Sequence, residues 1–426
     1  MERIVYQQLI KWKNSTDRKP LILNGARQVG KTWLLNEFGK REYKHLAYVN
    51  CRNNQLAQQL FSLDFDVERI IRGLRALSHV NITAADTLIV LDEVQDIPQS
   101  IEALKYFHED ANEYHIAVAG SMLGISLHSN VSFPVGKVNV IDVYPMSFEE
   151  FLLAVGEDEL RKMVANRLYG DLAVFHDKLI GLLKEYYFVG GMPEAVGQYV
   201  SSGDSGTVRR IHNEILRGYE LDFSKHAPRE QVPRIRMVWQ SVASQLFREN
   251  KKFIYGTLKK GARAREFEIA IQWLVDAGLV YKVPRCVKPA IPLKVYEDVA
   301  SFKLYLLDIG LLGALAGVDP ANILLTFDAL TQFKGGMTEQ FILQQLKSKD
   351  TSPIYYHSSD DSRLELDFVI QYHGDVLPIE VKAGVNVRAN SLSRLLQRDS
   401  ALNAVRFSLR PYVRQGQLTC VPLYLA

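Results

Sequence analysis

A short motif near the N-terminus constrains the fold of this 426-residue chain more than any other feature. Residues 20–38, PLILNGARQVGKTWLLNEF, run from a short apolar strand through a glycine-bearing loop into an amphipathic helix. Residues 25–32 fit the pattern G-x-x-x-x-G-K-[ST], in which backbone N–H groups and the positive end of the helix face phosphate. The motif predicts a phosphate-binding loop, and an ordinary strand–helix turn is the alternative.

The residue types in this loop have separate physical roles. Gly25 and Gly30 allow the backbone to curl around phosphate groups. Lys31 is expected to bridge the β- and γ-phosphates, and the Thr32 hydroxyl to bind Mg²⁺. The remaining loop residues complete the expected nucleotide contacts: Ala26, Arg27, Gln28 and Val29.

Two later strands provide the polar groups that such a loop needs. Residues 88–96, LIVLDEVQD, predict a buried parallel strand that ends in Asp92 and Glu93. Asp92 is expected to hold Mg²⁺ through water and Glu93 to orient the attacking water, although acids at strand ends also cap helices. Residues 115–121, HIAVAGS, predict a third strand, after which Ser121 either senses the γ-phosphate or forms an ordinary turn.

These segments, together with VYPMSFEEFL at residues 143–152, resemble a family of bacterial and archaeal AAA-type ATPases. The C-terminal part of that family is a domain of little-known function that is similar to PD-(D/E)XK nucleases. The resemblance continues in FVGGMPEAV (188–196) and KLYLLDIGLLGAL (303–315), and so covers nearly the whole chain. It implies ATP and Mg²⁺ as cofactors.

The resemblance also suggests one nucleotide contact and shows one departure. Related signal-transduction ATPases place a lid proline near the adenine, so Pro193 is a candidate, with a helix N1 proline as the alternative. The family usually has Gly-Arg before its P-[LM]-S-F segment, and that arginine is a natural finger acting in trans. This chain has Gly136 and Lys137 there, and an ammonium lacks the bidentate fork of a guanidinium.

The middle of the chain contains an unusually basic segment. Residues 151–225 are expected to be helical, and residues 238–285 to form three helices and a strand that resemble a winged helix. Residues 247–265 have seven bases and one acid, a net charge of +6, whereas the whole chain has +3. We expect this segment to contact DNA phosphates, and a solvated face or a protein-docking module are the alternatives. The seven bases are Arg248, Lys251, Lys252, Lys259, Lys260, Arg263 and Arg265.

The sequence ELDFVIQYHGDVLPIEVKAG, residues 365–384, predicts a β-hairpin with a turn near Gly374. Its strict alternation of apolar and polar residues places Asp367 roughly opposite Glu380, about 5 Å apart between Cβ atoms. Lys382 follows on the same face. This face is either a solvated sheet surface or a metal-dependent active site.

The resemblance to nucleases favours the second interpretation. The expected order of helix, strand, strand, helix and strand is that of the restriction-endonuclease-like core, whose site takes an acid from the first helix. Here Glu339 lies in that helix. Glu339, Asp367 and Glu380 are then expected to bind Mg²⁺, while Lys382 positions the nucleophilic water.

Composition and length complete the expectations. Three distant cysteines and the lack of a signal peptide or long apolar run indicate a cytoplasmic protein without a membrane partner. The expected fold is an α/β AAA-type P-loop domain with a parallel sheet (1–150), a helical lid or linker (151–230), a winged helix (231–320) and a restriction-endonuclease-like α/β domain (321–426).

Two functions follow from this organisation. The first is an ATP-hydrolysing protein that acts on DNA through residues 247–265 and a metal-dependent, nuclease-like C-terminal domain. The second is a nucleotide-dependent switch that forms homo-oligomers and whose C-terminal domain binds a partner without cleaving it.

Overall fold

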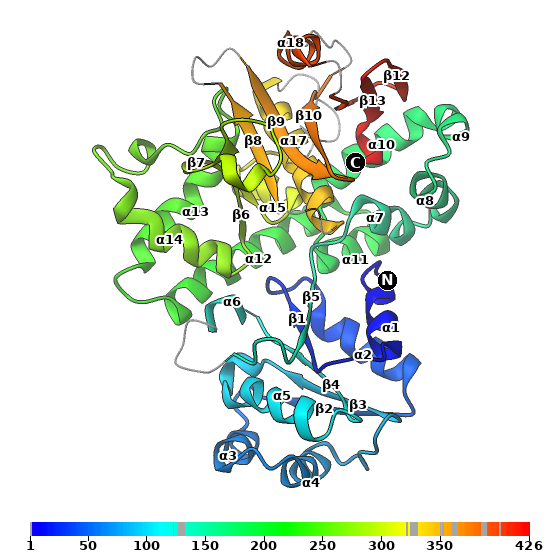
Figure 1. The fold of residues 1–426 in the computed structure, drawn as a ribbon, viewed down its shortest axis with the longest axis vertical. Helices are drawn as coiled ribbons and strands as arrows, with labels where there is room; N and C mark the ends of the chain where they lie inside the picture. Colours follow the sequence, from blue (N-terminus) through cyan, green and yellow to red (C-terminus); the bar gives the residue numbers. More distant parts are fainter. Residues whose placement is uncertain are drawn as a thin grey trace. The chain divides into compact units, whose positions relative to one another are not determined.

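The computed structural model describes residues 2–121, 123–126, 133–320, 323, 331–349, 351, 353–359, 364–384, 390–399 and 402–426. The chain divides into two compact units (Figure 1). The first unit comprises Met1–Tyr144 with Asp276–Gly278, and the second comprises Pro145–Val275 with Leu279–Ala426. None of the helices in the described part of the chain is long and apolar enough to cross a membrane.

The first unit contains a five-stranded sheet in the order β2-β3-β4-β1-β5, and every neighbouring pair is parallel. Its strands are β1 (Leu21–Asn24), β2 (His45–Asn50), β3 (Thr87–Asp92), β4 (His115–Ala119) and β5 (Asn139–Asp142). Every residue of β3 and β4 is buried, which explains their nearly continuous apolar sequences. The expected α/β fold with a parallel sheet is confirmed.

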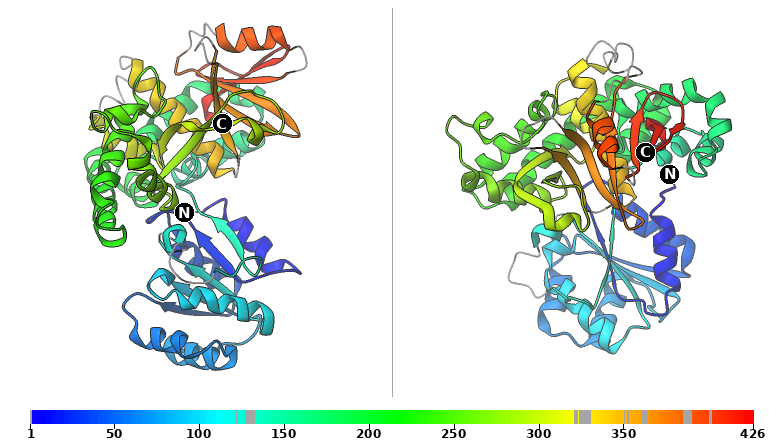
Figure 2. Two further views of the ribbon diagram at one scale, coloured as in Figure 1. Left: turned by 60° about the vertical axis from the view of Figure 1, so that its left-hand side comes forward. Right: turned by 45° about the horizontal axis from the view of Figure 1, so that its top comes forward.

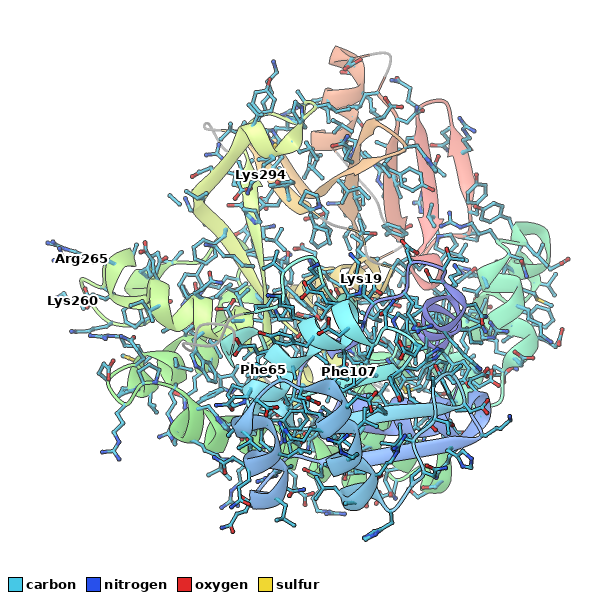
Figure 3. All side chains as sticks on the ribbon, turned by 60° about the horizontal axis from the view of Figure 1, so that its bottom comes forward. Lys19, Phe65, Phe107, Lys260, Arg265 and Lys294 are labelled. Carbon is cyan, nitrogen blue, oxygen red and sulfur yellow. The ribbon has the colours of Figure 1, made fainter. Side chains whose placement is uncertain are left out.

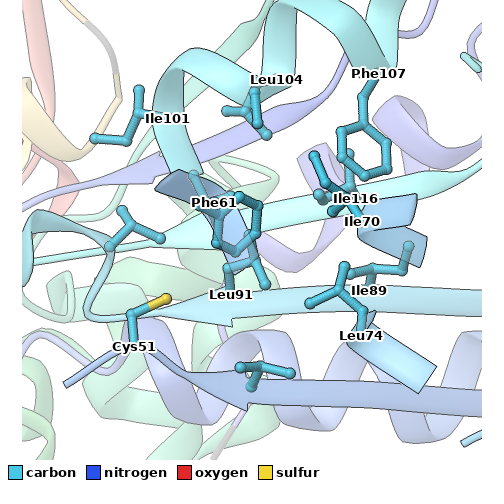
Figure 4. Close-up of a cluster of buried hydrophobic side chains, with 14 of the residues drawn as sticks. Cys51, Phe61, Ile70, Leu74, Ile89, Leu91, Ile101, Leu104, Phe107 and Ile116 are labelled. Carbon is cyan, nitrogen blue, oxygen red and sulfur yellow. The ribbon is translucent and has the colours of Figure 1, made fainter. Parts of the chain in front are cut away.

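Helix α1 (Tyr6–Asn14) precedes the first of these strands, and the other helices of this unit connect the strands. The connecting helices are α2 (Lys31–Glu42), α3 (Gln55–Leu63), α4 (Val67–Ser78), the 3₁₀ helix η1 (Val94–Asp96), α5 (Gln99–Asp110) and α6 (Leu123–Ser126). Figure 4 shows how side chains of α3, α4 and α5, such as Phe61, Ile70 and Phe107, pack on Ile89 and Leu91 of β3. The helices thus hold the carboxyl ends of the strands in place, and ligands of open α/β sheets bind at these ends.

The second unit begins with a series of helices. They are α7 (Phe148–Ala154), α8 (Asp158–Ala165), α9 (Tyr169–Val174), α10 (His176–Val189), α11 (Pro193–Ser202), α12 (Ser205–His226), α13 (Val232–Leu246), the 3₁₀ helix η2 (Tyr255–Thr257) and α14 (Ala264–Asp276). Residues between α13 and α14 form only the short η2, where the sequence suggested a full helix. Gly261, in the left-handed region with a φ of 76°, interrupts this stretch before α14 begins.

A mixed sheet follows, which Figure 2 shows from two further sides. It has eight strands in the order β12-β13-β11-β10-β9-β8-β6-β7. Its strands are β6 (Val280–Cys286), β7 (Glu297–Leu306), β8 (Ile354–Ser358), β9 (Glu365–Tyr372), β10 (Asp375–Val381), β11 (Ala404–Ser408), β12 (Val413–Gln415) and β13 (Leu418–Pro422). The helices of this region are η3 (Leu293–Tyr296), α15 (Ile309–Leu315), α17 (Thr331–Ser348), α18 (Asn390–Arg398) and η5 (Leu423–Leu425). Because β6 pairs with β8, the sheet is continuous across the domain boundary expected at residue 320. The winged helix and the nuclease-like fold stay predictions.

The hairpin predicted from residues 365–384 consists of β9 and β10. Its register pairs Tyr372 with Asp375 and Phe368 with Ile379. The two turn residues, His373 and Gly374, have φ angles of 50° and 90°, as a two-residue turn with both central residues in the left-handed region requires. The prediction of this hairpin is confirmed.

Three of the sequence segments behind the family resemblance meet in a buried polar cluster in the second unit. The Asp308 carboxylate caps α15 by accepting the Leu311 N–H at 3.0 Å, and it also accepts the Gly191 N–H at 2.6 Å. A Cβ atom at Gly190 would collide with Asp308, so only glycine fits there. Met146 joins the cluster because its N–H donates to the Gly191 carbonyl at 2.6 Å.

Glutamine side chains of α17 complete this cluster. The Gln340 amide both accepts from the Leu306 N–H (2.9 Å) and donates to the Leu306 carbonyl (2.6 Å). Gln344 accepts from the Ile309 N–H, and Gln345 from the Phe148 N–H, each at 2.9 Å. Helix α17 is therefore held by hydrogen bonds to buried backbone groups as well as by its apolar side chains.

Candidate functional site

The loop between β1 and α2 has the curled backbone that the motif predicts. Gly25 and Gly30 have φ angles of 146° and 95°, and a Cβ atom on Gly25 would collide with the Val143 carbonyl. Arg3 supports this loop from the N-terminus, since its guanidinium donates to the Val29 carbonyl at 2.9 Å and to the Tyr144 carbonyl at 2.7 Å. The loop is thus held from outside in its curled form.

Lys31 is buried at the start of α2. Its ammonium donates to the carbonyls of Gly25 and Ala26, each at 2.8 Å. Burial lowers the pKa of Lys31 to about 8, and the nearby carboxylates of Glu93 and Asp92 oppose this effect. These carbonyl partners are neutral, so the positive charge remains for an anion such as a phosphate group.

Asp92 at the end of β3 is the centre of a group of oxygen atoms. Its Oδ2 accepts from the Thr32 hydroxyl at 2.7 Å and from the Tyr48 hydroxyl at 2.9 Å. A carboxylate and a hydroxyl oxygen are the hard ligands that Mg²⁺ prefers, usually completed by water and substrate phosphates. The oxygen atoms of Thr32 and Asp92 are therefore compatible with Mg²⁺, and Mg²⁺ binding by these two residues stays a prediction. The sequence analysis missed Tyr48. The pairing of β2 with β3 is the feature that brings Tyr48 here.

Glu93 follows Asp92 in an uncommon backbone conformation. Its φ of 55° is in the left-handed region, which costs free energy for a residue other than glycine and is frequent at functional sites. Its carboxylate accepts hydrogen bonds from the Gln95 side-chain amide and from the Ser121 hydroxyl, the latter at 3.3 Å. The predicted residues Glu93 and Ser121 thus lie together, and Gln95 joins them.

Gln95 is a residue that the sequence analysis overlooked. Its Nε2 faces Glu93 and also Ser121 (3.4 Å), while its Oε1 is buried without a hydrogen-bond partner among the described residues. A Cβ atom on Gly120 would lie 2.5 Å from this Oε1, so the glycine leaves room for the amide. Its place two positions after Glu93 in LDEVQD was the available signal.

The other predicted nucleotide contacts have varied surroundings. Ala26 and Val29 are buried in the loop, Arg27 is half-buried and Gln28 is exposed. Pro193 lies in the second unit as the first residue of α11, and its contact with adenine stays a prediction.

Lys137, the residue in the place of the family arginine, pairs with Glu109 of α5. Their side chains lie 3.0 Å apart and are about one third exposed. This pairing lowers the pKa of the Glu109 carboxyl below its usual range.

In the second unit, two of the predicted metal ligands share a buried site. Glu339 of α17 pairs with Lys251 and lies 3.7 Å from the Lys303 ammonium, and it accepts from the Tyr305 hydroxyl at 3.1 Å. Asp367 of β9 accepts from the Val381 N–H at 2.7 Å and hydrogen-bonds with Glu339. The structure therefore brings Glu339 and Asp367 together, but with two lysines.

Burial and charge shift these groups in opposite directions. Burial and the Glu339 carboxylate raise the pKa of Asp367 to about 7. Burial alone would raise the pKa of Glu339, but Lys251 and Lys303 lower it to about 2. Burial would lower the pKa of Lys303, yet Glu339, Glu365 and Asp367 raise it above its ordinary value.

The remaining two predicted residues form a second group on β10. Glu380 is buried and accepts from the Arg406 guanidinium at 2.8 Å, while the Lys382 ammonium lies 3.3 Å from its other oxygen. Continuing the hairpin register by one residue places Glu380 opposite Asp367, as predicted. Arg406, on the neighbouring strand β11, was missed because it lies 26 residues away in the sequence.

The C-terminal residues do not fit a magnesium site as they stand in this structure. Within the described ranges, no group of three or more His, Cys, Asp or Glu side chains could hold a metal ion. Glu339 and Glu380 each already pair with cationic side chains. The expectation that Glu339, Asp367 and Glu380 together hold Mg²⁺ thus finds no support here.

The basic segment 247–265 is mostly at the surface. Six of its seven bases are exposed, and Figure 3 shows Lys260 and Arg265 extending away from the ribbon. Lys251 is the exception, because it turns inward to Glu339. The exposed bases are Arg248, Lys252, Lys259, Lys260, Arg263 and Arg265.

Three regions of the chain match protein families. Residues 17–152 match the AAA domain, residues 180–322 match a domain of unknown function (DUF8612), and residues 334–425 match another domain of unknown function (DUF4143). No curated protein matches the chain.

Several solved structures are similar at low identity. The Walker-type ATPase PABY2304 of Pyrococcus abyssi is 13% identical with a TM-score of 0.46, covering 73% of this chain and 94% of its own. The Orc1 protein of Aeropyrum pernix in complex with DNA is 15% identical with a TM-score of 0.30, over 74% and 90% of the chains. The RuvB Holliday junction branch migration motor of Thermotoga maritima is 13% identical with a TM-score of 0.28, over 65% and 86%. At such scores, these similarities do not show what this chain acts on.

The family match coincides with the geometry of the first unit. The matched residues include the phosphate-binding loop, Asp92, Glu93 and Ser121, on a parallel five-stranded sheet. Residues 17–152 of this chain are therefore an AAA-type P-loop domain, followed by two regions that match domains of unknown function.

Proposed function

We propose that the first unit binds ATP with Mg²⁺ and hydrolyses it. The observation that carries this proposal is the Thr32–Asp92 hydrogen bond of 2.7 Å next to the buried Lys31. Phosphate groups, a divalent cation and water need these groups together at the carboxyl edge of a parallel sheet. Mg²⁺, when bound, neutralises phosphate charge and is held by Thr32 and Asp92.

The side chains of this unit then have separate roles in ATP hydrolysis. The loop N–H groups and the Lys31 ammonium stabilise the negative charge that develops on the phosphates. Glu93 orients the attacking water and accepts its proton, while Ser121 and Gln95 fix the Glu93 carboxylate.

A phosphate-release assay with the purified chain tests this proposal. We expect wild type to hydrolyse ATP, Glu93→Gln to bind ATP normally but hydrolyse it about 10²-fold or more slowly, and Lys31→Ala to lose binding. Equal turnover in wild type and Glu93→Gln, with binding unchanged, would exclude Glu93 as the base. No nucleotide binding by wild type would exclude the function.

We also propose that the second unit contacts DNA through the exposed bases of residues 247–265 and does not cut the DNA. The high positive charge of this surface supports DNA contact. The lysine and arginine partners of Glu339 and Glu380 support the absence of cleavage, because a metal ion would have to displace these buried cations.

The metal-dependent nuclease is the competing proposal, and plasmid nicking separates the two. Supercoiled plasmid is incubated with Mg²⁺ or Mn²⁺, with and without ATP, and with wild type or Asp367→Ala. We expect wild type to bind the plasmid and leave it intact. Nicking that is lost in Asp367→Ala would establish the nuclease instead.

The nucleotide-dependent switch adds self-association to ATP binding. In this proposal ATP binds tightly and assembles several copies of the chain, and its turnover is slow because Lys137 stands where the family has its arginine finger. Light scattering with and without ATP measures the mass directly, and an unchanged monomer mass at high protein concentration would exclude it.

A further inference from the structure

A polar cavity in the second unit lies beside the basic segment. Its volume is about 370 Å³, at the lower end of the range of small-molecule binding sites. The segment after α13 contributes Glu249, Asn250 and Lys252, and the sheet contributes side chains of β6, β8 and β9. The cavity therefore shares residues with the surface that we expect to contact DNA.

The wall of this cavity contains a buried polar group without a partner. Tyr356 of β8 is only 2% exposed, and its hydroxyl makes no hydrogen bond to any described residue. Burial raises the pKa of this hydroxyl to about 12, so it stays protonated and can donate. Because an unsatisfied buried hydroxyl is costly, a ligand that accepts from Tyr356 would gain affinity by satisfying it.

The position of the Tyr356 side chain is fixed by its neighbours. The Lys303 ammonium lies 5.0 Å from the centre of the Tyr356 ring, a cation–π contact. Lys303 in turn pairs with Glu365, which lines the cavity, at 3.0 Å. These contacts hold the aromatic ring while its hydroxyl is left without a partner.

The charges around the cavity indicate the class of ligand. Lys252 and Arg285 are positive, whereas Glu249 and Glu365 are negative. The Arg285 guanidinium is fixed in place by two hydrogen bonds to the Ser358 carbonyl, at 2.9 and 2.6 Å. A simple anion would meet two carboxylates and a simple cation would meet two bases. A nucleotide suits both signs, because it has an anionic phosphate and a base edge with donors and acceptors.

The surface around the cavity favours a nucleotide that belongs to a strand. Exposed bases of the same segment, among them Arg248, Lys259 and Lys260, offer sites for the phosphates of flanking nucleotides. A base that is stacked and paired in a duplex cannot enter a cavity, so the nucleotide must be unpaired. We propose that this cavity binds one unpaired nucleotide of a DNA strand, with the basic segment holding the adjoining backbone. This inference rests on the proposed DNA contact of the second unit.

Fluorescence anisotropy with labelled DNA of one length tests the inference. The full chain is titrated, without nucleotide and in EDTA, into a single strand and a blunt duplex. We expect wild type to bind the single strand about tenfold more tightly. Tyr356→Phe, which removes only the hydroxyl, is expected to weaken single-strand binding about fivefold or more and to leave duplex binding unchanged.

Two control variants make the result specific. Tyr355→Phe removes a hydroxyl from the residue next to Tyr356 in β8. The Tyr355 hydroxyl donates to Glu297 at 3.2 Å, and its loss should not alter DNA binding. A variant with Lys259, Lys260 and Arg263 all replaced by serine should weaken single strand and duplex alike.

The possible outcomes distinguish nucleotide binding in the cavity from the proposed DNA contact of the second unit. If wild type binds duplex as well as single strand, or if Tyr356→Phe matches wild type, the cavity does not take an unpaired nucleotide, although DNA contact stands. If thymidine monophosphate displaces the single strand at equal nucleotide concentration, the cavity binds free nucleotides. This result would overturn the proposal that its ligand is a nucleotide within a strand. If no DNA binds at all, the DNA contact fails as well.

Discussion

Asp92 in the first unit and Glu339 in the second are both buried carboxylates, 4% and 3% exposed, yet their partners are opposite in kind. Asp92 accepts from the neutral hydroxyls of Thr32 and Tyr48, so its negative charge remains for an incoming cation. Glu339 pairs with the ammonium groups of Lys251 and Lys303, which neutralise it from within the protein. Buried acids therefore indicate a metal site only when the protein does not itself provide the cations.

The largest expected effect is a loss of stability when the Glu339 carboxylate is removed. Glu339→Ala would leave Lys251 and Lys303 without this buried partner, which costs about 3–5 kcal/mol. Urea unfolding of the variant and of wild type measures the difference. As a control, Glu249→Ala removes an exposed acid near Lys251 and should change the free energy of unfolding by less than about 0.5 kcal/mol. Equal stability of Glu339→Ala and wild type would mean that the two lysines do not depend on Glu339.

A smaller effect, on catalysis, is expected at Gln95. Gln95→Met keeps the size of the side chain but removes its hydrogen bonds to Glu93 and Ser121, so ATP turnover should fall about 10- to 100-fold. The KM for ATP should change little, since the side-chain hydrogen bonds of Gln95 to described residues go to Glu93 and Ser121 and not to the loop or Lys31.

Gly120→Ala provides an independent check of the same contact. Its Cβ atom would lie 2.5 Å from Gln95 Oε1 and should displace the amide, so its turnover should fall as in Gln95→Met. Steady-state kinetics of both variants measure this, and full activity in both would show that the Gln95 amide does not position Glu93.

A third prediction concerns pH. The pKa of Asp367 is about 7 in the folded protein, above the usual value near 4, so folding binds a proton and stability falls as pH rises from about 4 to 7. Asp367→Asn cannot ionise and its amide can still donate to Glu339. The variant should therefore gain stability relative to wild type across this pH range, by more than about 1 kcal/mol at pH 8.

Urea unfolding at pH 5, 6, 7 and 8 measures this gain. Asp375→Asn, at an exposed position in the same hairpin, is the matched control and should follow wild type at every pH. If Asp367→Asn follows wild type too, Asp367 is ionised throughout and the two carboxylates do not share a proton.

The smallest effect is expected at Lys137. Its ion pair with Glu109 is partly exposed, so Lys137→Ala should lower the free energy of unfolding by less than about 1 kcal/mol. Thermal unfolding at low and high salt checks this. A loss of several kcal/mol would show that the partly exposed Lys137–Glu109 pair stabilises the protein as much as the buried pairs of Glu339 are expected to.

Local sequence patterns determined much of this protein. The glycine spacing of residues 25–32 and the apolar run before Asp92 predicted the loop, the parallel strands and the residues at their ends. The alternation around Gly374 predicted the hairpin. These features depend on neighbours within a few residues, because backbone geometry and side-chain period act over that range.

Only the tertiary structure decided which partners the charged groups have. Lys251 reaches Glu339 from 88 residues away, and Arg406 reaches Glu380 from 26. The residue spacing of the hairpin places Asp367, Glu380 and Lys382 on one face. It does so regardless of whether Lys251 and Arg406 pack against that face. The charge of a buried site depends on every group that packs against it, and the packing of distant elements is not encoded in the local pattern.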